Sequence, residues 1–124
     1  MNSIDFDKLV ERRIGLIRDV LAAKGAEYAT PFGDDRLHNF RRQAEMQRTT
    51  MAKTAWSLVA KQIVSTQDMI ESGKQYPGHL WDEKLGDIIN YAILIEAIVR
   101  DDDLAIQGMG TVALWNMAVG DPGS

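Results

Sequence analysis

The chain lacks cysteine altogether, so neither a disulfide framework nor a thiolate metal site can form. Proline is scarce: only three of the 124 residues are proline. Two of these, Pro77 and Pro122, lie in segments that we expect to interrupt helices. The absence of cysteine is compatible with a reducing compartment, and we expect the protein to act in the cytoplasm.

Long apolar runs and an excess of positive charge are missing too. The longest apolar run, residues 92–95, is followed by Glu96 and is far too short for a membrane span. The first residues lack the apolar stretch of a signal peptide. A net charge of −4 argues against general nucleic-acid binding, which usually needs a basic surface. We therefore expect neither a membrane nor a nucleic acid as a direct partner.

What the sequence does contain is typical of one globular domain. Apolar residues make up 45% and charged residues 26% of the chain, and no repeat, low-complexity segment or linker divides it. We predict a single domain over residues 1–124. Its core spans about residues 5–101, and residues 102–124 form a C-terminal segment.

Apolar residues recur at helical spacing, and no segment shows the period-two pattern of a strand. Gly25 is expected to end the first helix, and Thr49 or Thr50 to cap the third. The fold class predicted is all-α, an antiparallel helical bundle. Its four main helices and one short C-terminal helix cover about residues 5–24, 35–46, 50–72, 80–100 and 111–119. The last main helix is apolar around most of its circumference, which favours a homo-oligomer.

A line of polar residues runs along this otherwise apolar fourth helix. Glu83, Asp87 and Asn90 follow one another at spacings of four and three, so their side chains lie on one face. An isolated buried carboxylate is costly and needs a partner. Mg²⁺, which prefers oxygen ligands, is one such partner. Lysine or arginine side chains from another helix are the alternative, and spacing alone leaves both open.

The third helix carries a similar line. Lys61, Ser65 and Asp68 also follow at spacings of four and three. Lys61 is a candidate phosphate contact and Asp68 a candidate third carboxylate for a metal ion, although a self-contained surface network is equally compatible. Tyr28, after the first helix, is a candidate for stacking on a base or for ordinary packing. Near the second helix, arginines gather at four positions: Arg36, Arg41, Arg42 and Arg48. They form either a solvated face or an anion contact.

Four segments resemble a family of small phage and prophage proteins associated with nucleotide modification and described as dATP/dGTP diphosphohydrolase-like. This family is similar in outline to the MazG-like all-α nucleoside triphosphate pyrophosphatases. The segments occupy residues 24–29, 35–45, 60–69 and 81–99 and read KGAEYA, DRLHNFRRQAE, AKQIVSTQDM and WDEKLGDIINYAILIEAIV.

The resemblance implies an oligomeric helical protein that binds a nucleotide through acidic helix positions and Mg²⁺, with Mn²⁺ as a substitute. Glu83 and Asp87 match the family's acidic pair, and Asn90 and Tyr91 match the polar and aromatic residues that follow it. Two features depart from the pattern. No EExxE run occurs on an earlier helix, and Gln62 follows Lys61 where a histidine is common in the phage family. Both departures bear on catalysis more than on binding.

Three functions stay open. The first is a Mg²⁺-dependent nucleoside triphosphate pyrophosphohydrolase, in which Glu83 and Asp87 act in catalysis and hold the metal ion with Asp68. Its substrate contacts would be Lys61, Arg36, Asn39, Asn90, Tyr28 and Tyr91. The second is a phage protein that binds or sequesters a nucleotide without hydrolysing it. The third is a structural or interaction protein whose acidic residues pair with a basic residue across a helix interface, and Lys84 is a candidate for such pairing between subunits.

Overall fold

The computed structural model describes the backbone of residues 1–30 and 33–107, and the side chains of residues 1–25 and 35–101. The short helix predicted over residues 111–119 lies outside these residues. Four helices and a pair of two-residue strands make up the described chain. Their order is α1 (Ser3–Tyr28), β1 (Ala29–Thr30), β2 (Gly33–Asp34), α2 (His38–Gln47), α3 (Met51–Ser72) and α4 (Gly78–Gln107). The prediction of an all-α protein is confirmed.

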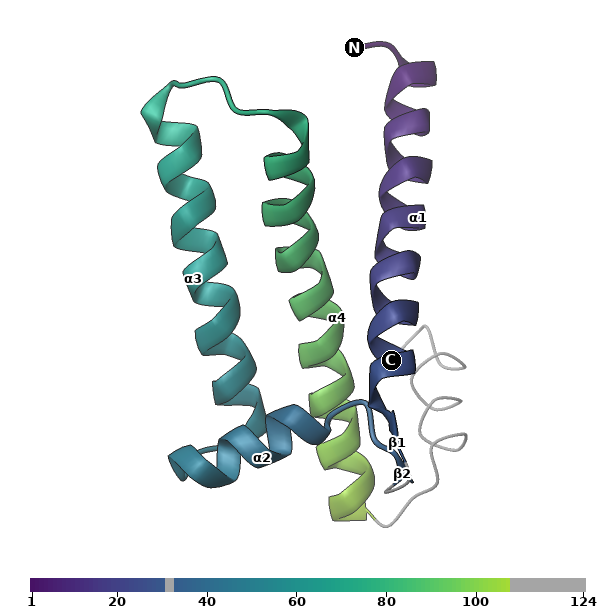
Figure 1. Ribbon diagram of the computed structural model, residues 1–124, viewed down its shortest axis with the longest axis vertical. Coiled ribbons are helices and arrows are strands. Elements are labelled where there is room, and N and C mark those ends of the chain that lie inside the picture. The colour runs from purple at the N-terminus through teal and green to yellow at the C-terminus, as the bar shows by residue number, and fades with distance from the viewer. Residues whose placement is uncertain (31–32, 108–124) are drawn as a thin grey trace.

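The three long helices lie side by side, with α4 between α3 and α1, and the short helix α2 crosses one end of the layer (Figure 1). Contacts join α4 to both α3 and α1. The hairpin of α3 and α4 is antiparallel as predicted. However, α1 runs in the same direction as α4, because α2 carries the chain across the end of the layer before α3 begins (Figure 1). The prediction of an antiparallel arrangement therefore holds for only part of the molecule.

Local sequence signals set both ends of α3. Thr50 has an extended backbone, and its side chain accepts a hydrogen bond from the backbone N–H of Lys53 at 3.1 Å. Gly73, with φ of 68°, follows the last turn in the left-handed conformation that glycine adopts without strain. The predicted limits of the third helix are thus confirmed at both ends.

The first helix extends further than its sequence predicts. Gly25 lies within α1, which continues to Tyr28, so the prediction that Gly25 ends the helix is wrong. The missing side chain instead leaves room for Arg36, whose guanidinium donates a hydrogen bond to the Leu21 carbonyl oxygen at 2.6 Å. After α1 the chain forms the antiparallel β1–β2 pair, in which Ala29 pairs with Asp34 and Thr30 pairs with Gly33.

The buried core is small and lies where α2 crosses the long helices. Leu37, Ala55 and Ile98 form its centre, and the last two are fully buried. The side chains packed around them are only partly buried: Phe40, Met51, Ala52 and Ile95. Many large apolar side chains elsewhere are exposed, including Phe6 and Trp56. One layer of helices cannot enclose its own apolar residues on both faces.

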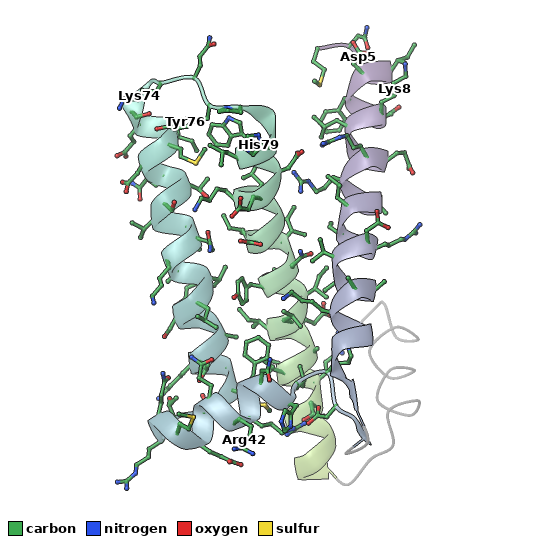
Figure 2. The ribbon with its side chains drawn as sticks, viewed as in Figure 1. Asp5, Lys8, Arg42, Lys74, Tyr76 and His79 are labelled. Atoms are coloured by element: carbon green, nitrogen blue, oxygen red, sulfur yellow. The ribbon has the colours of Figure 1, made fainter. Side chains whose placement is uncertain are left out.

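An arginine of α2 links this helix to α4, and the four arginines near α2 do not gather at one place. Arg41 donates hydrogen bonds to Asp35 at 2.7 Å and to Asp101 of α4 at 2.8 Å. Partial burial pulls the pKa of Asp35 upward, but the hydrogen bonds from Arg41 and from the backbone N–H of Leu37, with the positive charge of Arg41, together outweigh it, so the pKa lies below its usual value. Arg42 instead points away from the long helices (Figure 2). The four arginines therefore do not form one anion site.

An ion pair near the other end of α1 holds this helix to α4. Both terminal nitrogens of Arg12 donate to the Asp82 carboxylate, at 2.9 and 2.6 Å, and Arg13 donates to the Asp82 backbone oxygen at 3.2 Å. The hydrogen bond from Arg12 lowers the pKa of Asp82. Since Arg12 is largely exposed, this pair aligns the helices more than it stabilises them.

Candidate functional site

A cavity of about 380 Å³ lies between α1, α2 and α4, and Leu58 of α3 also lines it. Its volume is within the range of small-molecule sites. The lining side chains come from segments far apart in the sequence: Val20, Leu21, Lys24, Arg36, Asn39, Phe40, Gln43, Leu58, Asp87, Asn90, Tyr91 and Leu94. A second hollow of about 260 Å³ adjoins it, and Val20, Asp87 and Asn90 line both.

Asn90 is the least satisfied polar residue of this cavity. It is only 8% exposed, and its Oδ1 atom has no hydrogen-bond partner among the described residues. A buried carbonyl oxygen without a partner costs on the order of 1–3 kcal/mol, so native proteins rarely keep one without a reason. Because Asn90 lines the cavity, a bound donor group or cation can supply the missing partner.

Asp87 lies one turn before Asn90 on α4 and lines the same cavity. Burial raises the pKa of its carboxyl group, and the negative charge of Glu83 raises it further, while Lys84 and Lys24 partly oppose the shift. Within the described part of the chain, no ion pair joins Glu83 or Asp87 to an arginine or lysine. The described residues of this one chain therefore do not supply the cross-helix ion pair that is the alternative to a metal ion.

Positive charge and amide groups line the same cavity. Lys24 reaches it from α1, and Arg36 from the residues that precede α2. Asn39 and Gln43 add two amides one turn apart on α2, and the aromatic rings of Phe40 and Tyr91 add apolar wall. The cavity therefore offers positive charges for an anionic group, amides for a polar heterocycle and aromatic rings for apolar surface of a ligand.

The structure brings together five of the residues proposed from sequence. Arg36, Asn39, Asp87, Asn90 and Tyr91 all line the larger cavity. Glu83 is exposed and lines the adjoining hollow.

Two further proposed residues do not join this group. Lys61 and Asp68 lie with Ser65 in a separate, shallow depression on α3. The side chain of Tyr28 lies outside the described residues.

Three polar or aromatic side chains of the cavity are not among the contacts predicted from the sequence: Phe40, Gln43 and Lys24. A signal was present for the first two, because Arg36, Phe40 and Gln43 follow at spacings of four and three, like the acidic line on α4.

The donor atoms near Asp87 suit a hard divalent cation. Glu83, Asp87 and the Asn90 Oδ1 atom offer oxygen ligands only, and Mg²⁺ commonly takes one or two carboxylates and completes its shell with water and phosphate. In the described residues, no group of three His, Cys, Asp or Glu side chains lies close enough to hold a metal ion. Asp68 is therefore not brought to Glu83 and Asp87 within this chain.

Comparisons with known proteins find no significant similarity to this chain. No family model matches it, and neither a curated protein nor a solved structure is significantly similar. None of the described helices is both long and apolar enough to cross a membrane.

Proposed function

We propose that the cavity binds a nucleoside triphosphate together with Mg²⁺, and that the protein hydrolyses the nucleotide and releases pyrophosphate. The observation that carries this proposal is the buried Asn90 Oδ1 atom beside Asp87, which has no hydrogen-bond partner among the described residues. In the same part of the chain, the Asp87 carboxyl group forms no ion pair with an arginine or a lysine. Such groups are costly unless a ligand engages them. The resemblance to phage proteins related to MazG-like pyrophosphatases points to the same substrate class.

Each side chain has a distinct task in this proposal. Glu83 and Asp87 hold Mg²⁺, with Mn²⁺ as a substitute. When bound, the ion supplies charge stabilisation for the triphosphate and lowers the pKa of a bound water. Lys24 and Arg36 neutralise phosphate charge. Asn39, Asn90 and Tyr91 orient the base or sugar. The proposal places this activity in the cytoplasm, which is the host cytoplasm if the protein is encoded by a phage.

A second candidate is nucleotide binding without hydrolysis. Of the three carboxylates that line the two hollows, Asp82 is already paired with Arg12, which leaves Glu83 and Asp87. Two carboxylates suffice to bind a Mg²⁺–nucleotide complex. A hydrolase that activates water and clamps a triphosphate commonly uses more, so this count favours a sequestering protein.

A panel of nucleotides separates the two candidates. The purified protein is incubated with each common NTP and dNTP in Mg²⁺ and then Mn²⁺, and released pyrophosphate and the thermal unfolding midpoint are both followed. We expect pyrophosphate from a subset of the nucleotides and a metal-dependent rise of the midpoint. A rise without turnover supports the sequestering protein. If neither signal occurs with any nucleotide, both proposals are wrong.

We also propose that the protein is a homo-oligomer through the face of α3 and α4 that lies opposite the cavity. Exposed apolar residues recur there every seven positions: Trp56, Ile63 and Ile70 on α3, and Leu85, Ala92 and Val99 on α4. Trp56 lines one shallow depression together with Ile95 of α4, which lies one helical turn from both Ala92 and Val99. Seven-residue spacing on an antiparallel hairpin is typical of half a four-helix bundle.

A second copy of the chain is the occupant that this face fits. Burying the exposed parts of these side chains in two copies removes on the order of 1,000 Å² of surface, at the lower limit of specific interfaces. We expect Ile63→Lys to shift the protein from dimer to monomer in sedimentation velocity experiments at micromolar concentration. Val64→Lys is the matched control, since Val64 is 57% exposed but outside the stripe. Equal behaviour of the two variants would exclude this face.

A further inference from the structure

We infer that Gly25 is a positioning residue, which lets the guanidinium of Arg36 lie across α1 as part of a phosphate subsite in the cavity. The inference rests on the proposed function in so far as the phosphate belongs to a nucleotide. It assigns a role to a glycine that the sequence predicts only as the end of a helix.

The geometry around Gly25 is unusually close. A Cβ atom built on Gly25 would lie 2.8 Å from Nη1, 2.9 Å from Cζ and 3.2 Å from Nη2 of Arg36. Contacts below 3.0 Å force a shift, so a side chain at position 25 would displace the Arg36 guanidinium. The same guanidinium donates a hydrogen bond to the Leu21 carbonyl oxygen at 2.6 Å, one turn earlier on α1. Arg36 is therefore held against the helix backbone at a point where the missing side chain of Gly25 leaves it room.

This placement serves the cavity, because Arg36 and Lys24 both line it. A guanidinium fixed at one nitrogen offers its planar N–H groups in a defined direction, which suits the oxygens of a phosphate. Lys24 directly precedes Gly25 in α1 and adds a second positive charge. Two cations beside the acidic residues Asp87 and Glu83 match a polyphosphate that is bound together with a divalent cation.

Alanine at position 25 separates this role from a purely structural one. The atoms that a new methyl group would meet belong to the flexible end of Arg36 and not to the backbone, so the guanidinium moves while α1 stays in place. Alanine also favours a helix interior over glycine, which offsets the lost hydrogen bond to Leu21. We expect Gly25→Ala to keep its unfolding midpoint close to that of the wild-type protein while it loses the positioned guanidinium.

Gly15 provides the matched control. It lies in the same helix, and no atom is within 4 Å of the Cβ that alanine would add there. Gly15→Ala therefore makes the same change of residue and of helix propensity without displacing an arginine. Any difference between the two variants reports the contact between Gly25 and Arg36.

The experiment measures binding of inorganic tripolyphosphate by isothermal titration calorimetry, without divalent metal, to the full chain. We expect wild type and Gly15→Ala to bind equally, and both Gly25→Ala and Arg36→Gln to bind about tenfold more weakly, as for one lost charge-assisted hydrogen bond. The double variant Gly25→Ala/Arg36→Gln should lose no more than Arg36→Gln alone, because glycine acts through the arginine.

Three results would overturn the inference: no tripolyphosphate binding by the wild type, equal affinity of Gly25→Ala and Gly15→Ala, or additive losses in the double variant. The outcome is distinguishable from that of the proposed function. If no nucleotide is hydrolysed but tripolyphosphate binding depends on Gly25, the subsite stands and the hydrolase is wrong. If nucleotides are hydrolysed with the same KM by both glycine variants, the hydrolase stands and the positioning role is wrong.

Discussion

Replacing Asp87 with asparagine is expected to abolish magnesium-dependent nucleotide turnover while it makes the folded protein more stable at neutral pH. Asparagine keeps the size of the side chain but removes the charge that would hold the metal ion. A metal ion contributes several kcal/mol of charge stabilisation, and each 1.4 kcal/mol is tenfold in rate, so turnover should fall by about a hundredfold or more.

The expected gain in stability follows from the raised pKa of Asp87, which burial and the charge of Glu83 cause. A carboxyl group whose pKa is raised on folding stabilises the fold below its ordinary pKa of about 3.9, and this contribution is lost as the pH rises through the raised value. At pH 7 the ionised Asp87 therefore costs stability in the metal-free protein. Thermal unfolding in a chelator should give a higher midpoint for Asp87→Asn at pH 7, and the difference should shrink below about pH 4.

Asp68→Asn is the control for both effects. It makes the same substitution on α3, in the depression that is separate from the cavity, at a carboxyl group that is exposed. We expect its turnover and its unfolding midpoint to match those of the wild type. Full turnover by Asp87→Asn, or equal loss in both variants, would contradict the assignment of the metal ion to Asp87.

Ile98→Ala is expected to have the largest effect on stability of any conservative truncation in α4. Ile98 is fully buried and lies in the core cluster with Leu37 and Ala55. Removing three of its carbon atoms leaves a cavity among side chains from α2, α3 and α4 and should cost about 2–5 kcal/mol. A small domain has a total stability of only about 5–15 kcal/mol, so this variant should be close to unfolding at body temperature.

Urea unfolding at a fixed protein concentration measures this effect, since an oligomer's stability depends on concentration. Ile93→Ala is the matched control, because Ile93 lies on the same helix but is 39% exposed. We expect it to lose less than half as much stability. Equal losses in the two variants would mean that the core is not centred on the crossing of α2 and the long helices.

Features fixed by neighbours along the chain could be predicted from the sequence. Thr50 caps α3 through a hydrogen bond three residues away, and Gly73 ends it through its own backbone angles. The line of Asp87 and Asn90 on one face of α4 follows from helical geometry alone. Each depends on atoms within about one turn of helix, so the local sequence contains the necessary information.

The orientation of each helix face could not be predicted in the same way. Lys61 and Asp68 have the same spacing as the acidic line of α4, but their face of α3 lines a separate depression. The spacing of residues along a helix places them on one face, but it does not determine which neighbouring helix this face contacts. Likewise, the local sequence predicts that Gly25 ends a helix. The side chain that packs against Gly25 belongs to Arg36, eleven residues later in the chain, so the local sequence does not reveal the contact.

The most direct test of the central claim is a calorimetric titration of the full-length protein with non-hydrolysable nucleoside triphosphate analogues, one for each base, with and without Mg²⁺. We predict saturable binding of at least one analogue, one molecule per chain, which is strengthened by Mg²⁺ and abolished by Asp87→Asn but not by Asp68→Asn. No binding of any analogue in either condition, or binding that survives Asp87→Asn unchanged, would contradict a nucleotide site at this cavity.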